Sequence, residues 1–214
     1  MDTHTLGLSL AYLGSAIGVV MVMPQILRIV RHPHMGGVSP WTWSLVAVSC
    51  SLWLTYGVRS QSLPQIPGNV LLIAGAVSIV LLVPAAWSRR RRAGGLAATA
   101  VVLVLASTRL APEQVGFLAF SISLFGMWPQ VYETAWARRG MGPSAISLTS
   151  NALKFAAQVC WLSFAILTTD PPVVAGAVMA LSTNSVITSI ELGRRRATPG
   201  SNSVLEPSPV GALA

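Results

Sequence analysis

Two tryptophans and an asparagine carry the side chains best suited to bind a small neutral solute. Trp53, Asn69 and Trp161 all fall within apolar stretches of the chain. A buried amide is costly unless it has hydrogen-bond partners, whereas an indole offers a flat apolar face and one donor. A sugar presents hydroxyl groups at the edge of its ring and C–H groups on its face. Tryptophan stacking combined with amide hydrogen bonds is therefore an appropriate site for a sugar.

These residues belong to a pattern that occurs twice. A Pro-Gln pair stands near the end of two apolar segments, as Pro24-Gln25 and as Pro129-Gln130. Downstream of the pairs, four matches are each separated by 108 positions: Ser39 and Ser147, Trp53 and Trp161, Tyr56 and Phe164, Gly68 and Gly176. One constant offset through four matches indicates the internal duplication of a three-helix unit.

The duplication is incomplete at the asparagine. Ala177 stands at the position that matches Asn69. Asn184 lies two turns further along the same helix face, and two interpretations of it stay open. It either supplies the missing amide at another depth or makes a hydrogen bond that packs helices together.

The composition indicates an integral membrane protein. The 214 residues are 53% hydrophobic and only 9% charged, and the mean hydropathy is +0.65, which is too apolar for a water-soluble fold. The net charge of +8 comes from short basic clusters at helix ends without interleaved aromatic residues, which argues against nucleic-acid binding. The expected partners are membrane lipid and a small-molecule substrate, and a homo-oligomer is one option for the assembly.

Seven apolar segments approach the roughly 20 residues that a helix needs to cross a bilayer. They cover Leu6–Arg28, Pro40–Val58, Ile66–Trp87, Gly94–Leu110, Val115–Trp136, Ser147–Leu167 and Pro171–Leu192. Three crossings would invert the next copy, so one extra helix is needed to keep both units the same way up. We expect an all-α integral membrane protein with seven transmembrane helices, in which two parallel three-helix bundles are joined by a linker helix (3-1-3).

The expected boundaries follow from these segments. The first repeat covers 1–88, the linker helix 89–112, the second repeat 113–196, and a disordered cytoplasmic tail 197–214. Counted over alternate connections, eleven arginines fall on one side and two, Arg59 and Arg109, on the other. This bias places the N-terminus outside and the C-terminus in the cytoplasm. Thirteen arginines against one lysine hint at a GC-rich bacterial genome and hence at a bacterial plasma membrane.

The Pro-Gln pairs are candidate hinges. A proline inside a helix removes one backbone donor and clashes with the carbonyl four residues earlier, so the helix can bend there. Gln25 and Gln130 could satisfy the freed carbonyls, which lipid cannot. Because both pairs sit toward the cytoplasmic face, we expect Pro24 and Pro129 to act in a cytoplasmic gate. The alternative is a static kink or a simple helix end.

The charged residues give four further expectations. Lys154 either snorkels back to the cytoplasmic interface or forms a cationic wall of the pathway. Arg59 and Asp170 lie on the outer side and either pair as a latch between the bundles or stay solvated. All six acidic residues fall at helix ends or in loops, so no carboxylate is expected inside the membrane to carry a proton, which favours facilitated diffusion. No metal site, cofactor or enzyme active site is expected, because no ligand cluster or nucleophile–base pair can be assembled.

A family resemblance rests on the paired Pro-Gln helices, the segment Leu52-Trp53-Leu-Thr-Tyr56-Gly57 and the following Pro67-Gly68-Asn69. With these motifs the chain resembles the PQ-loop superfamily, and within it the SWEET sugar transporters and their half-sized bacterial relatives. The resemblance implies hinge prolines at Pro24 and Pro129, a sugar pocket at Trp53, Asn69 and Trp161, and an outer lip at Tyr56 and Phe164. It implies a uniporter of a small sugar that works by alternating access. The alternatives are a carrier of amino acids or other metabolites, and a non-transporting receptor or scaffold like the ER retrieval receptors.

Overall fold

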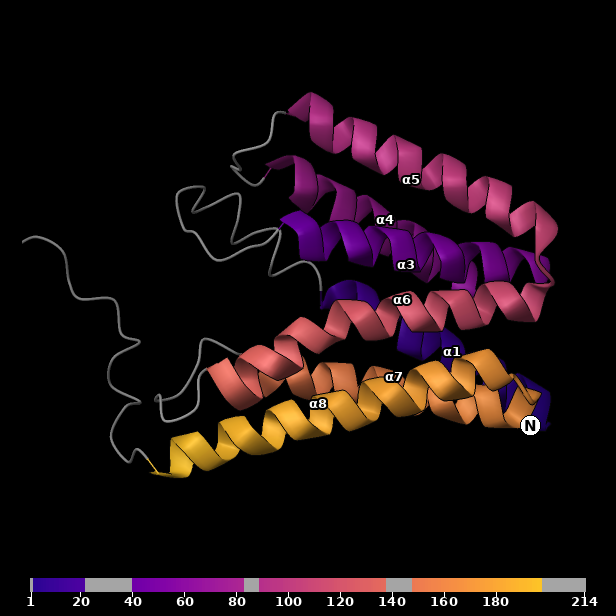
Figure 1. Ribbon diagram of the computed structural model, residues 1–214. Coiled ribbons are helices and arrows are strands. Elements are labelled where there is room, and N and C mark those ends of the chain that lie inside the picture. Colours follow the sequence, from indigo (N-terminus) through magenta and orange to yellow (C-terminus); the bar gives the residue numbers. More distant parts are fainter. Residues whose placement is uncertain (1, 22–39, 83–88, 138–147, 198–214) are drawn as a thin grey trace, which may run out of the picture.

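The computed structural model describes residues 2–21, 40–82, 89–137 and 148–197, and helices dominate them (Figure 1). The described α-helices are α1 (Thr3–Val20), α3 (Pro40–Arg59), α4 (Gln65–Leu82), α5 (Arg89–Arg109), α6 (Pro112–Tyr132), α7 (Leu148–Thr168) and α8 (Pro171–Ala197). A π-helical turn, η1 (Glu133–Ala137), continues α6. The protein is therefore all-helical over its described residues, as the sequence predicts.

The helix starts follow ordinary capping chemistry. The carboxylate of Asp2 accepts a hydrogen bond of 2.6 Å from the Thr5 amide and caps α1. Helices α3, α6 and α8 each begin at a proline, which loses no hydrogen bond in the first helical turn because that amide has no partner there. Gln114 reaches back to accept from the Ala111 amide at 2.8 Å and caps α6.

Among the described residues, four helices are long and apolar enough to cross a bilayer: α1, α4, the Asn151–Thr168 part of α7, and α8. Large apolar side chains on the outer surface, such as Phe125 and Ile166, are exposed and suit a lipid environment. The protein is a multi-pass membrane protein. The spans expected over α3, α5 and α6 do not meet the same standard of length and hydropathy, and they stay predictions.

By order in the chain, α1, α3 and α4 are called here the first triplet, and α6, α7 and α8 the second (Figure 1). In the first, α4 packs against α3 and α1; in the second, α8 packs against α7 and α6. The triplets join crosswise, because α1 packs on α7 and α3 packs on α6. Helix α5 lies outside, against α3 and α4. Each contact in one triplet thus has a counterpart in the other.

The two ends of the bundle differ in their connections. One end, called here the turn end, holds the start of α1 and the short connections 60–64, 110–111 and 169–170. The opposite end, called here the arginine end, holds the end of α8 with Arg194, Arg195 and Arg196. Helices α1 and α6 both run away from the turn end (Figure 1). The two triplets therefore point the same way.

A hydrophobic core fills the space between the triplets on the side of the turn end. Its buried members include Leu52, Val115 and Ala165, from α3, α6 and α7. Tyr56 belongs to the same cluster and is only 4% exposed. The core therefore joins both triplets near the turn end.

Gly116 permits the closest approach in this region. A Cβ built on Gly116 would lie 2.7 Å from Cβ of Pro172 on α8, so an added methyl group forces the helices apart. We expect Gly116→Ala to lower the free energy of unfolding by about 1–3 kcal/mol, measured as a lower Tm in detergent. Gly95→Ala is the matched control, because no atom lies within 4 Å of its added Cβ. An equal Tm for both variants would contradict the close packing.

Candidate functional site

A cavity of about 340 Å³ lies where the two triplets meet. Six helices line it, namely α1, α3, α4, α6, α7 and α8, so both triplets contribute. Its wall combines small residues and apolar side chains with a few polar groups. None of the described residues that line it is charged.

The structure brings together three predicted residues in this cavity. Trp53, Asn69 and Trp161 all line it, from α3, α4 and α7. The amide nitrogen of Asn69 donates to the Gln65 carbonyl at 2.8 Å, which leaves the side-chain oxygen of Asn69 as an acceptor. Aromatic and amide groups thus line one cavity.

The tryptophans occupy equivalent places in the two triplets. Trp53 meets Tyr56 edge to face, with ring centroids 5.9 Å apart. Trp161 meets Phe164 in the same way at 5.8 Å. Such edge-to-face pairs fix the orientation of both rings. Each indole is therefore held in place by an aromatic neighbour on its turn-end side.

Two serines that the sequence reasoning missed support Trp53. Nε1 of Trp53 donates to the Ser123 hydroxyl at 3.3 Å, and the hydroxyls of Ser49 and Ser123 lie 2.6 Å apart. This short network crosses from α3 to α6 and satisfies the indole N–H inside the bundle. The sequence does contain a signal for Ser49, because this serine precedes Trp53 by one helical turn and so shares its helix face.

Glycines set how closely the cavity helices approach. A Cβ on Gly176 would lie 3.1 Å from Cζ2 of Trp53, and one on Gly14 would lie 3.2 Å from Cδ1 of Trp161. Gly18, one turn further along α1, has no atom within 4 Å of such a Cβ and lines the cavity. Small residues thus provide both the close contact and the open space.

Hydrogen bonds to Asp170 link the two triplets at the turn end, in an arrangement called here the clasp. The Tyr56 hydroxyl on α3 donates to Oδ1 of Asp170 at 2.6 Å. The same oxygen accepts from the Val173 amide at 3.2 Å and caps α8. Burial raises the pKa of the Asp170 carboxyl above its ordinary value, although both hydrogen bonds act in the opposite direction. The clasp links the first triplet to the second.

Of the two alternatives for Arg59 and Asp170, the latch is wrong, because each side chain has another partner. Arg59 donates to the Ser107 carbonyl on α5, while Asp170 accepts from Tyr56. The side chain of Tyr56 reaches Asp170 from inside the bundle, where it is 4% exposed, whereas Arg59 is on the exposed side of α3. Phe164, the counterpart of Tyr56, is also 4% exposed. The two rings lie between the tryptophans and the turn end, where the lip was expected.

The comparison with known protein families bears on the first third of the chain. Residues 6–66 match the PQ loop repeat family model. The matched stretch runs from α1 to the first residues of α4 and includes Pro24-Gln25 and Trp53. It supports a resemblance to the PQ-loop superfamily over these residues. No curated protein matches the chain.

The Pro-Gln pair of the matched PQ loop repeat, Pro24 and Gln25, lies outside the described residues. The second pair, Pro129-Gln130, lies beyond the matched stretch and falls within α6. The chain stays helical through this pair and changes to the π-helical turn η1 at Glu133. Such turns are common at functional sites and at bends in helices. The structure is compatible with the expected hinge and leaves it a prediction.

The remaining two candidate pocket residues do not reach the cavity. Asn184 is 6% exposed and donates through its side-chain amide to the Asn151 carbonyl at 2.9 Å. The structure therefore has the helix-packing alternative, and the interpretation of Asn184 as a pocket amide is wrong. Lys154 is exposed on the outside of α7 and does not line the cavity. This position fits snorkelling and not a wall of the pathway.

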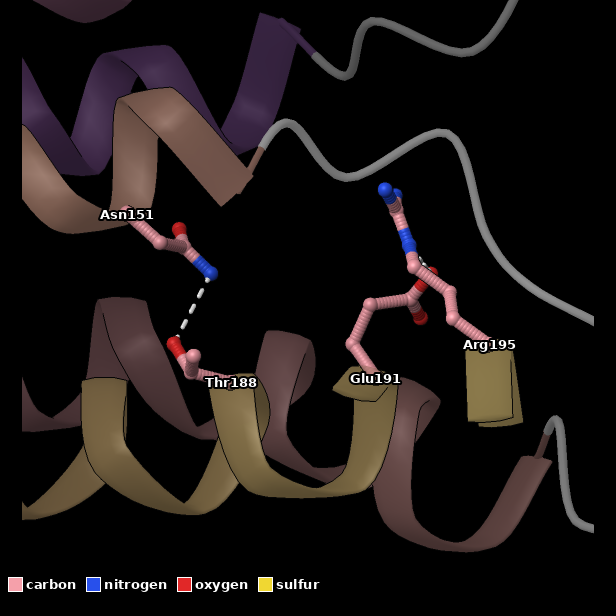
Figure 2. Close-up of polar contacts among 4 residues, drawn as sticks. All are labelled: Asn151, Thr188, Glu191 and Arg195. Carbon is pink, nitrogen blue, oxygen red and sulfur yellow. Dashed lines mark hydrogen bonds and ion pairs between the residues drawn. The ribbon is translucent and has the colours of Figure 1, made fainter. Parts of the chain in front are cut away.

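A second polar group lies toward the arginine end (Figure 2). Asn151 on α7 donates to the Thr188 hydroxyl at 3.2 Å, and Glu191 pairs with Arg195 at 3.2 Å. Glu191 is fully buried within α8. The expectation that every acidic residue lies at a helix end or in a loop is therefore wrong for Glu191. It does not line the cavity.

Helix α8 also contacts the end of α6. Arg194 donates to the Thr134 carbonyl of η1 at 2.7 Å, and Thr134 is 1% exposed. A cation is favourable where helix carbonyls lack partners. Position 194 matches Ala86 in the first repeat, which has no cationic side chain at that position. Among the described residues, no group of three or more His, Cys, Asp or Glu could hold a metal ion.

Proposed function

We propose that the protein is a facilitative transporter that carries a small neutral sugar across the membrane by alternating access. The observation that carries this proposal is the shared cavity of Trp53, Asn69 and Trp161, whose described lining holds no charged side chain. Aromatic faces and an amide suit a ring that carries hydroxyl groups. The volume of about 340 Å³ is near the lower end of the roughly 300–1,000 Å³ typical of ligand pockets, which favours a small solute.

Two repeats rocking against each other supply the motion in this proposal. The first repeat comprises α1, α3 and α4, the second α6, α7 and α8, and α5 is the linker helix. Their crosswise packing and common direction support this 3-1-3 organisation. The Tyr56–Asp170 clasp keeps the turn end closed, so exchange of the solute takes place through the arginine end. Pro24-Gln25 and Pro129-Gln130 are the hinges that open and close that end.

The orientation follows from the arginines. The arginine end faces the cytoplasm in the proposed topology, with the N-terminus outside and the C-terminus inside, because positively charged residues concentrate on the cytoplasmic side. A bacterial plasma membrane is the proposed location. No carboxylate lines the described cavity, which supports uniport over proton-driven transport.

Uptake into proteoliposomes tests the proposal. We expect labelled monosaccharides to enter down their concentration gradient, and an uncoupler to leave the rate unchanged. Lys154→Met is the control, because Lys154 does not line the cavity, and it should transport at the wild-type rate. Three outcomes would overturn the proposal: uptake that collapses with the uncoupler, uptake of amino acids alone, and no uptake of any sugar. The second outcome, together with loss of transport in Lys154→Met, would favour an amino-acid carrier, and the third would favour a receptor or scaffold.

A further inference from the structure

Gln158 brings a further side-chain amide into the cavity, from the second repeat. It lines the cavity from α7, one helical turn before Trp161, and residues three apart share a helix face. Within the described part of the chain, no hydrogen bond occupies its amide. Gln65 also lines the cavity, but its amide nitrogen donates to the Ser62 hydroxyl at 3.3 Å.

The two repeats place their amides at different positions. In the first repeat the cavity receives Cys50 from the middle helix and Asn69 from the third helix. In the second repeat the matching positions hold Gln158 and Ala177, and both line the cavity. At these two matched positions each repeat therefore presents one amide and one small side chain, with the two exchanged between the helices. The second repeat thus has its cavity amide on α7, at Gln158, and not on α8 at position 177.

We propose that Gln158 is the second substrate-binding amide and that it determines which sugar the cavity accepts. This inference rests on the proposed function. The Asn69 oxygen is free to accept a hydrogen bond, whereas the Gln158 amide can donate and accept at once. Gln158 and Trp161 share one face of α7. The hydroxyls that Gln158 hydrogen-bonds therefore belong to the sugar ring that stacks on the Trp161 indole. A site built to bond a hydroxyl rejects the analogue that lacks it, because the buried amide is then left unpaired.

The test is a binding titration on purified full-length protein with the monosaccharide that gives the fastest uptake. Gln158→Met removes the amide and keeps the length of the side chain, and we expect the Kd to rise about ten-fold, as for one lost hydrogen bond. The same variant should discriminate less between that sugar and its deoxy analogues. Gln158→Met combined with Ala177→Asn returns an amide to the cavity and should recover most of the affinity.

The outcomes separate the inference from the proposed function. If Gln158→Met binds the sugar as tightly as the wild type and discriminates equally well, the inference is overturned while the transport proposal stands. If the wild type binds no sugar, the proposed function fails and the inference with it. Gln158→Cys, which copies the residue of the first repeat, repeats the test should the methionine variant be unstable by Tm. Lys154→Met on the same helix serves as the control with unchanged Kd.

Discussion

Replacing Trp161 by alanine is expected to weaken sugar binding by about 30-fold or more. A large aromatic residue that anchors a ligand in a desolvated pocket typically contributes at least about 2 kcal/mol, which corresponds to this factor. Trp161 lines the cavity beside Phe164. Among the described residues no side chain accepts a hydrogen bond from its indole N–H, whereas Ser123 accepts one from that of Trp53. The measurement is the Kd of the transported sugar, read by titration in detergent.

Two variants separate stacking from general disruption. Trp161→Phe keeps an aromatic face and should retain most of the affinity. Trp128→Ala removes a tryptophan that is 57% exposed on α6 and should leave the Kd unchanged. Equal affinity of Trp161→Ala and the wild type would show that the sugar does not stack on this ring.

Removing the hydroxyl of Tyr56 is expected to shift the protein toward a state that is open at the turn end. Tyr56→Phe keeps the packed ring and deletes the 2.6 Å hydrogen bond to Asp170. A hydrogen bond to a charged group contributes about 1.5–3 kcal/mol, so the ratio of open to closed protein should rise about ten-fold or more. Pairs of spin labels at Leu63 and Ile166, which are exposed on opposite triplets, report the separation of the turn end.

The label experiment requires a background in which Cys50 and Cys160 are replaced by alanine. Tyr12→Phe is the matched control, since Tyr12 is 46% exposed on α1 and should not affect the distance distribution. A distribution for Tyr56→Phe identical to that of the parent protein would mean that the clasp does not hold the turn end closed.

The repeat in the sequence was sufficient to relate the cavity residues of the two halves to each other. A constant offset of 108 positions ties Trp161 to Trp53, and helical spacing determines which face of each helix they share. The two triplets with a common direction follow from the same duplication. The match of residues 6–66 to the PQ loop repeat agrees with the family that those motifs resemble.

The side-chain roles that the sequence did not predict depend on contacts between helices. Glu191 was placed at a helix end because the apolar stretch stops at Leu192, whereas α8 continues to Ala197 and buries Glu191 completely. Asn184 was open between two roles because its partner, the Asn151 carbonyl, lies on another helix. Asp170 bonds Tyr56 and not Arg59 because the side chain of Tyr56 points inward. In each case the partner is set by tertiary packing.

Photo-crosslinking with a diazirine-bearing monosaccharide tests most directly whether the sugar occupies the cavity between the two triplets. The protein in liposomes is irradiated with and without excess unlabelled sugar, and the adducts are located by mass spectrometry. The account predicts adducts on cavity-lining residues of α4 and α8, such as Leu72 and Ala180, that the unlabelled sugar prevents. Adducts confined to outward-facing residues such as Leu105 of α5, or insensitive to competition, would contradict it.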